Sequence, residues 1–201
     1  MASEAPDPVL DDIALVRAAQ RGDREAFGVL VSRHASSIFS LTTRMLGPTA
    51  DAEDVAQESF VTAFKALPDF KAAAKFSTWL YRIAVNKCND SLRSRHSSHG
   101  PEMVSLDATG EDGSVVWEVA DQETPHWELE QAELAWELDK GIQALPHLYR
   151  ESFVLRHVEG LGYDEMSAIL GVHRDTIKMR VYKARTLLCE LLAHLNDPMT
   201  R

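Results

Sequence analysis

Cysteine is scarce in this sequence, and long apolar runs are missing. The 201 residues include two cysteines, Cys88 and Cys189, and their wide separation indicates no disulfide framework. No apolar run approaches the roughly 18 residues that a membrane span requires. The acidic N-terminal stretch MASEAPDPVLDD lacks the apolar core of a secretory signal. These absences predict a cytoplasmic protein with reduced thiols and no membrane span.

Motifs for metal binding and catalysis are also missing. Eight histidines are present, but His96 and His99 flank serines without a third ligand nearby, and no spacing matches that of a zinc site. The sequence has no Gly-x-Ser-x-Gly turn and no phosphate-binding glycine loop. We therefore expect no metal, no other cofactor and no enzymatic activity.

Charge is distributed unevenly along the chain. The formal net charge is -10, yet residues 173–185 contain five cations against one acid. Residues 96–139 contain 12 acidic side chains and no lysine or arginine. The first half of this acidic stretch holds serine, glycine and proline without periodicity, which is typical of a flexible linker. Because much of the acidic surplus is separated from the cationic segment, the net charge does not exclude nucleic-acid binding.

Apolar residues in the first half of the chain recur at helical spacing. Intervals of three and four from Phe27 to Met45 predict a long helix, which Asp23 can cap and Gly47-Pro48 ends. Two further helices are predicted with these limits: Thr49 or Asp51 to Pro68, and Ser77 to about Arg95. No segment alternates with period two, so we expect no sheet.

The helical pattern resumes near Trp127, and its inward positions are Leu129, Ala132, Trp136 and Ile142. The next helix has Pro146 in its first turn and ends at Gly160. A turn at Gly171 then separates a short helix from a longer one, as in a helix-turn-helix. We therefore predict an all-α fold of two small helical domains joined by a flexible acidic linker. The limits are 1–95 for the first domain, 96–128 for the linker and 129–201 for the second domain.

The last predicted helix has one apolar side and one polar side. At about 100° per residue, its apolar positions fall within one arc: Ile177, Val181, Ala184 and Leu188. Apart from Met179, the other sides present charged or hydrogen-bonding groups: Asp175, Thr176, Lys178, Arg180, Tyr182, Lys183 and Thr186. This pattern favours a recognition helix that reads DNA. The alternative is a solvated basic helix without a ligand.

A second candidate surface lies on the helix predicted from Ser77 to Arg95. One side of that helix carries Trp79, Arg82, Asn86, Asp90 and Arg93. Aromatic rings stack on unpaired bases while cations contact the phosphates, so this side suits single-stranded nucleic acid. The alternative is that Trp79 belongs to the core of a small helical domain.

An acidic stripe marks the preceding helix. Asp54, Gln57, Glu58 and Val61 point outward, with Asp51 nearby. Acids in a first helical turn also stabilise the helix dipole, which is the alternative explanation. An acidic face and a cationic face on adjacent helices nevertheless predict two different partners, a basic protein surface and nucleic acid.

Two parts of the chain resemble the extracytoplasmic-function sigma factors of bacteria. DAEDVAQESFVTAFKAL and FSTWLYRIAVNKCNDSLR are similar to region two of that family, and LPHLYRESFVLRHVEGLGYDEMSAILGVHRDTIKMRVYKARTLL is similar to region four. The resemblance implies an initiation factor that recruits core RNA polymerase to promoters and helps to open the DNA. The alternatives are a helix-turn-helix regulator that acts without stable polymerase association, and a helical protein-interaction module.

The resemblance also assigns residues to partners. Region two of the family docks on the clamp helices of the largest polymerase subunit, and region four on the flap of the second-largest subunit. The matching clamp-docking positions are Asp51, Asp54, Gln57 and Glu58. The positions that match minus-ten contacts are Phe70, Lys71, Trp79, Arg82, Asn86, Lys87 and Arg93, with Arg95 as a further phosphate contact. In the family the loop before this helix captures a flipped base, which gives sequence readout that the closed duplex hides.

The minus-thirty-five contacts implied by the resemblance lie on the last helix. They are Arg174, Thr176, Lys178, Met179, Arg180, Tyr182 and Lys183. Met179 offers only apolar contact, for instance with a thymine methyl group, and lysine lacks the bidentate fork of arginine. An anti-sigma protein is a further implied partner. The acidic linker either mimics nucleic acid in the polymerase cleft or serves as a plain spacer.

Overall fold

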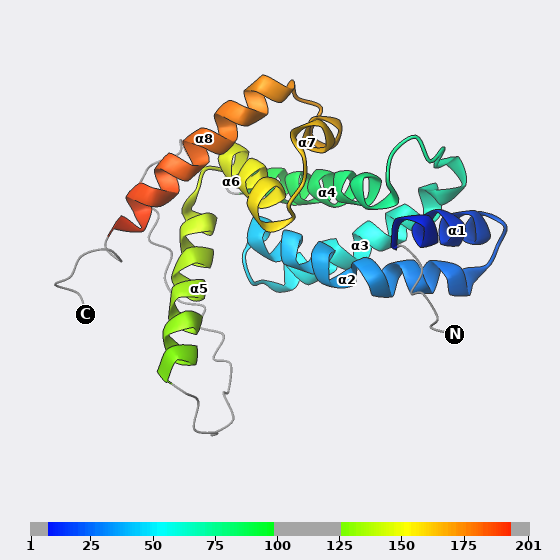
Figure 1. Cartoon of the computed structure of the whole chain (residues 1–201), viewed down its shortest axis with the longest axis horizontal. Helices are drawn as coiled ribbons and strands as arrows, with labels where there is room; N and C mark the ends of the chain where they lie inside the picture. The colour runs from blue at the N-terminus through cyan, green and yellow to red at the C-terminus, as the bar shows by residue number, and fades with distance from the viewer. Residues whose placement is uncertain (1–7, 99–125, 194–201) are drawn as a thin grey trace, which may run out of the picture.

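The computed structural model describes residues 8–98 and 126–193, which form helices and turns without a strand (Figure 1). The N-terminal lobe consists of α1 (Pro8–Gln20), α2 (Arg24–Leu46), α3 (Ala50–Ala66), the 3₁₀ turn η1 (Leu67–Asp69) and α4 (Phe76–Ser98). The C-terminal lobe consists of α5 (His126–Ala144), α6 (His147–Phe153), the π-helical turn η2 (Val154–Val158), α7 (Tyr163–Leu170) and α8 (Arg174–Leu191). The all-α prediction with two helical lobes is confirmed.

Local signals in the sequence set the limits of the first helices. The side chain of Asp23 accepts hydrogen bonds from the backbone N–H groups of Glu25 and Ala26, at 3.0 and 3.1 Å, and so caps α2. Gly47 ends α2 with φ 89°, in the region that favours glycine. Thr49 occupies the N-cap of α3 without a side-chain hydrogen bond. These predicted limits are confirmed.

Two expectations about helix limits and burial differ from the structure. Ser77 does not cap α4, because the helix already begins at Phe76. Trp136 does not point inward: its side chain is 57% exposed, and the Lys140 Nζ atom lies 3.1 Å from the ring centroid. The N-terminal part of α5 projects away from the other helices (Figure 1), and the exposure of Trp136 shows that no neighbouring helix covers this side chain either.

The predicted linker falls mostly outside the described residues. At its two ends, α4 continues to Ser98 and α5 begins at His126, so both helices enter the range expected to be linker. In the described parts of the chain, no helix is long and apolar enough to span a bilayer. The same residues contain no group of three side chains placed to hold a metal ion.

The two lobes pack against each other. Leu30, Leu41 and Leu80 are fully buried in the N-terminal lobe, and Leu155 and Met166 in the C-terminal lobe. α4 lies against α7, and α2 contacts α5, α6 and η2 (Figure 1). Across the boundary, Nη1 of Arg150 donates to the carbonyl oxygen of Met45 at 2.7 Å. The two helices predicted to contact DNA, α4 and α8, are therefore held in one body.

Candidate nucleic-acid and protein interfaces

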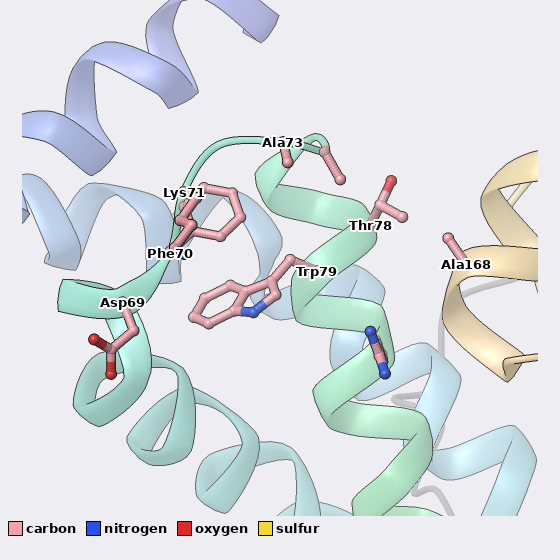
Figure 2. A pocket seen from close by; sticks show the side chains of 9 residues that line it. Asp69, Phe70, Lys71, Ala73, Thr78, Trp79 and Ala168 are labelled. Atoms are coloured by element: carbon pink, nitrogen blue, oxygen red, sulfur yellow. The ribbon is translucent and has the colours of Figure 1, made fainter.

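A cavity of about 240 Å³ lies beside the first turns of α4 (Figure 2). Its lining residues are Asp69, Phe70, Lys71, Ala73, Ala74, Thr78, Trp79, Arg82 and Ala168. The structure thus brings together four of the residues predicted to contact the minus-ten element: Phe70, Lys71, Trp79 and Arg82. The lining comes from the end of η1, the loop that follows it and the start of α4, except for Ala168 of α7.

The rings around this cavity form an aromatic cluster. The centroids of Phe70 and Trp79 lie 4.8 Å apart with planes tilted by 37°, and that of Phe76 lies 5.8 Å from Trp79. Phe76 is buried, whereas Trp79 is half-buried. Trp79 therefore packs on its own lobe and also borders the cavity, and its contact with unpaired bases stays a prediction. A cavity with aromatic walls and a guanidinium can receive a flat, hydrogen-bonding ring.

The cavity loop is anchored from the first helix. The side-chain amide of Gln20, at the end of α1, donates to the carbonyl oxygens of Leu67 and Phe70, each at 2.9 Å. Ala72 adopts φ 51°, a left-handed conformation that non-glycine residues rarely take. Gln20 holds the loop although 50 residues separate it from Phe70. No local sequence signal identifies this positioning residue.

The α3 acids and the α4 cations meet across a groove. Nη2 of Arg95 lies 2.5 Å from Oδ2 of Asp51, and Nζ of Lys87 lies 2.9 Å from Oε2 of Glu58. Asp54 lines the same groove. The acidic and cationic residues therefore do not form two independent faces, because two pairs of them neutralise each other in this structure.

The remaining predicted contacts on α3 and α4 are at the surface. Gln57 of α3 and Asn86 of α4 are exposed. Asn86 lies one turn beyond Arg82, on the same side of α4. Arg93 is also exposed and lies 3.2 Å from Asp90, measured between Nη2 and Oδ1. Exposed pairs of this kind contribute little to stability, so these side chains can exchange partners at small cost.

The helix-turn-helix places α8 with one buried side. Gly171 has φ 65°, and the Ser167 hydroxyl donates to the Val172 carbonyl oxygen at 2.8 Å, which fixes the turn between α7 and α8. The apolar positions of α8 are buried as predicted: Ile177, Val181, Ala184 and Leu188. On the opposite side Met179 and Tyr182 are 66% and 68% exposed. This side can enter a groove without disturbing the core.

The predicted DNA contacts of α8 differ in how firmly they are held. Thr176 and Lys183 are exposed. Lys178 Nζ lies 2.9 Å from Asp175 Oδ1, and Arg174 Nη1 lies 3.3 Å from Asp164 Oδ1, both at the surface. Arg180 instead points toward its own lobe.

Arg180 belongs to a buried ion pair. Its Nη1 atom lies 3.1 Å from Oε1 of Glu151, and the two side chains are 19% and 5% exposed. Burial raises the pKa of Glu151, while the positive charge of Arg180 and a hydrogen bond with Asn89 of α4 offset part of that rise. In this structure Arg180 compensates a buried carboxylate, which sets it apart from the other cations of α8.

The cysteines differ in accessibility. Cys88 is fully buried on α4, and burial raises the pKa of its thiol to about 12. Cys189 is exposed on α8. A buried thiol with a raised pKa is unreactive at neutral pH, so Cys88 serves packing.

Comparison with known proteins identifies both lobes. Sigma-70 region 2 matches residues 30–98, and Sigma-70, region 4 matches residues 135–188. The chain is 33% identical to the RNA polymerase sigma-H factor of Pseudomonas aeruginosa, over 92% of this chain and 95% of that protein. It is 34% identical to the ECF RNA polymerase sigma-E factor of Haemophilus influenzae, over 89% of this chain and 94% of that protein.

Solved structures show the same fold over most of the chain. The structure of CnrH in complex with the cytosolic domain of CnrY has a TM-score of 0.64 and 30% identity, and covers 92% of this chain and 98% of CnrH. The sigma factor RpoE of Bartonella quintana, in complex with the anti-sigma factor NepR, has a TM-score of 0.61 and 22% identity, and covers 83% and 96%. With both regions present in order, and full-length relatives of this kind, the chain belongs to the extracytoplasmic-function RNA polymerase sigma factors of the sigma-70 family.

Proposed function

We propose that this sigma factor reads the minus-ten element with the cavity at the start of α4. The observation that carries the proposal is that an aromatic-lined cavity opens beside Arg82, on the helix side that also holds Asn86. A base turned out of the duplex stacks on aromatic rings, and such stacking contributes about 1–3 kcal/mol. Arg82, Lys71, Lys87, Arg93 and Arg95 then contact the phosphates or the base edges of the separated strand.

The minus-thirty-five element is assigned to the exposed side of α8. Lys183, Lys178 and Arg174 supply positive charge, and Thr176 and Tyr182 supply hydrogen bonds. Met179 lies at the centre of this side with its side chain 66% exposed, so it can contact a thymine methyl group. Arg180 can contact a base only if its ion pair with Glu151 separates. We therefore expect Arg180 to contribute less to DNA binding than the other cations of α8.

Core RNA polymerase docks on the exposed acids of α3, with Asp54, Glu58 and Asp51 against the basic clamp helices of the largest subunit and Gln57 beside them. Complementary charge across such a surface favours association and specificity. The flap of the second-largest subunit is the partner of the C-terminal lobe. An anti-sigma protein that covers these surfaces is the expected inhibitor. The protein acts in the cytoplasm, without a cofactor and without enzymatic activity of its own.

Run-off transcription tests this proposal. Core RNA polymerase is mixed with pooled genomic fragments, with and without the protein. We expect discrete new transcripts whose start sites share two upstream elements. The absence of new transcripts, together with no binding between this protein and core RNA polymerase, would overturn the proposal. Tight duplex binding by the free protein, unaffected by polymerase, would instead establish a helix-turn-helix regulator.

A further inference from the structure

The cavity at the start of α4 has a single acid among the described residues that line it. This acid is Asp69, the last residue of η1, and the other charged groups of the lining are the cations Lys71 and Arg82. In Figure 2 the carboxylate of Asp69 lies near the Trp79 ring, on the other side of that ring from Thr78. A base that stacks on this ring can therefore turn an edge toward the carboxylate.

The carboxylate of Asp69 has no partner in the described part of the chain. Its side chain is exposed, and neither a hydrogen bond nor an ion pair within residues 8–98 and 126–193 holds it. The acids of α3 differ in this respect, because Asp51 pairs with Arg95 and Glu58 pairs with Lys87. Asp69 can therefore accept a hydrogen bond from a ligand in the cavity without giving up a bond within the protein.

A carboxylate is a costly group at a surface that binds a nucleic-acid strand. Every nucleotide of the strand carries a negative phosphate, and like charges across an interface oppose binding. Phosphate oxygens only accept hydrogen bonds, as an ionised carboxylate does, so Asp69 cannot contact the backbone favourably. The edges of the bases are different, because some of them present N–H groups. The position of Asp69 therefore favours contact with a base edge, whereas Lys71 and Arg82 suit the phosphates.

The pairing edges of the four bases differ in what they offer to a carboxylate. An unpaired guanine presents two parallel N–H groups, which match the two carboxylate oxygens, and adenine and cytosine each present an amino group. Thymine has no amino group, and its one N–H lies between two carbonyl oxygens. A carboxylate that approaches this N–H is repelled by both oxygens. Asp69 therefore has a favourable partner on three bases and an unfavourable one on thymine.

We infer that Asp69 is a specificity-determining residue, which selects a base with an amino group on its pairing edge and rejects thymine in the cavity. The inference rests on the proposed function, because it assigns a class of base to the same cavity. Stacking on Phe70 and Trp79 does not distinguish the bases, since every base has an aromatic face. The carboxylate supplies the distinction that the rings lack.

A barcoded promoter library tests this inference. A promoter recovered in the run-off experiment is randomised through its minus-ten element, and the transcripts from each template are counted by sequencing a barcode downstream of the start site. Core RNA polymerase transcribes the library with the unmodified protein or with a variant. For the unmodified protein we expect one position at which thymine gives at least ~10-fold fewer transcripts than the best base with an amino group, a ratio that one well-made base contact provides.

Asp69→Asn is the decisive variant, because it keeps the size of the side chain and replaces the carboxylate with an amide that both donates and accepts hydrogen bonds. We expect the deficit of thymine at that position to fall below ~3-fold, since the amide can donate to a thymine carbonyl oxygen. Preferences at the other positions should stay the same. Glu25→Gln, which replaces an exposed acid of α2 outside the cavity lining, is the matched control and should alter no preference.

The result separates a role in base selection from other roles of Asp69. A purely structural role would change transcription from all templates alike, and so would simple repulsion of the strand; either outcome would overturn the inference. Continued rejection of thymine by Asp69→Asn would also overturn it, as would equal use of thymine by the unmodified protein at every position. If no promoter supports transcription with the unmodified protein, the proposed function itself is wrong. If transcription succeeds with preferences that Asp69→Asn leaves unchanged, only the role of Asp69 is wrong.

Discussion

Replacing Arg180 with alanine tests whether this side chain mainly stabilises the folded protein or mainly binds DNA. Arg180 and Glu151 form an ion pair at 3.1 Å with side chains 19% and 5% exposed. Removing one partner of a buried pair costs about 3–5 kcal/mol, because the other charge is left without compensation. Since Arg180 retains some solvent contact, we expect the lower end, about 3 kcal/mol. That is a large part of the ~5–15 kcal/mol that stabilises a typical protein.

The pH dependence of the lost stability of Arg180→Ala identifies the cause of that loss. Burial already raises the pKa of Glu151, and the charge of Arg180 counteracts that rise. Without Arg180 the pKa rises further, so the folded state binds a proton more tightly than the unfolded state. The stability of Arg180→Ala should therefore recover as the pH falls through the raised pKa of Glu151 toward the ordinary carboxyl range. Adding Glu151→Gln should abolish that recovery.

Arg174→Ala is the matched control on the same helix. Its ion pair with Asp164 has a similar distance of 3.3 Å, but the side chains are 52% and 81% exposed. Such a pair contributes at most about 1 kcal/mol, so the control should lose little stability while it weakens DNA binding. Urea unfolding of the full chain, followed by circular dichroism, measures both variants. Equally small losses would refute the buried-pair reasoning and would make Arg180 an ordinary surface cation.

Four further outcomes are expected. Trp79→Ala should reduce promoter opening, measured by permanganate reactivity of unpaired thymines, about 5- to 150-fold through the loss of ~1–3 kcal/mol of stacking, with polymerase assembly unchanged. Asp54→Arg should weaken polymerase binding, measured by fluorescence anisotropy, because it places like charges on the docking surface. Gln20→Ala should speed amide exchange in residues 67–75 by freeing the cavity loop. At pH 8 a thiol reagent should modify Cys189 and reach Cys88, whose pKa is raised to about 12, only after denaturation.

Each of these expectations has a result that contradicts it. Normal opening by Trp79→Ala would remove that residue from strand separation. Unchanged polymerase affinity of Asp54→Arg would show that α3 is not the docking face, provided that Glu25→Arg, an exposed acid on α2, is equally neutral. Unaltered amide exchange in Gln20→Ala would show that the cavity loop keeps its conformation without the hydrogen bonds from Gln20. Rapid modification of Cys88 in the folded protein would show that α4 opens readily.

Periodicity predicted α2, α3 and α4 because each of them buries an apolar side, but it gave no prediction for α1. The sequence placed Asp23 and Gly47 at the ends of α2, where local hydrogen bonds and backbone angles decide the limits. It failed at Trp136, because spacing alone does not reveal whether a neighbouring helix covers an apolar residue. The same limitation left Trp79 undecided, and only the positions of Phe70 and Phe76 show that it belongs to both core and cavity.

The candidate sites required contacts between residues distant in sequence. Helical spacing separated the front and back of α8, but it could not show that Arg180 reaches Glu151, 29 residues away. Nor could it show that Gln20 supports the cavity loop or that Ala168 lines the cavity, because these contacts cross helices and lobes. The acids of α3 and the cations of α4 were predicted individually, whereas their pairing depends on how the two helices cross.

The paired charges between α3 and α4 make the two proposed partners of the N-terminal lobe thermodynamically linked. Asp51 and Glu58 cannot fully engage polymerase while they hold Arg95 and Lys87, and those cations cannot fully engage DNA while they hold the acids. Whichever partner arrives first separates the pairs, and the second then binds without that cost. Each exposed pair contributes about 0.2–1 kcal/mol, so separating both pairs can raise the affinity for the second partner by up to ~30-fold. By reciprocity, bound promoter DNA must raise the affinity of this protein for polymerase by the same factor by which bound polymerase raises its affinity for DNA.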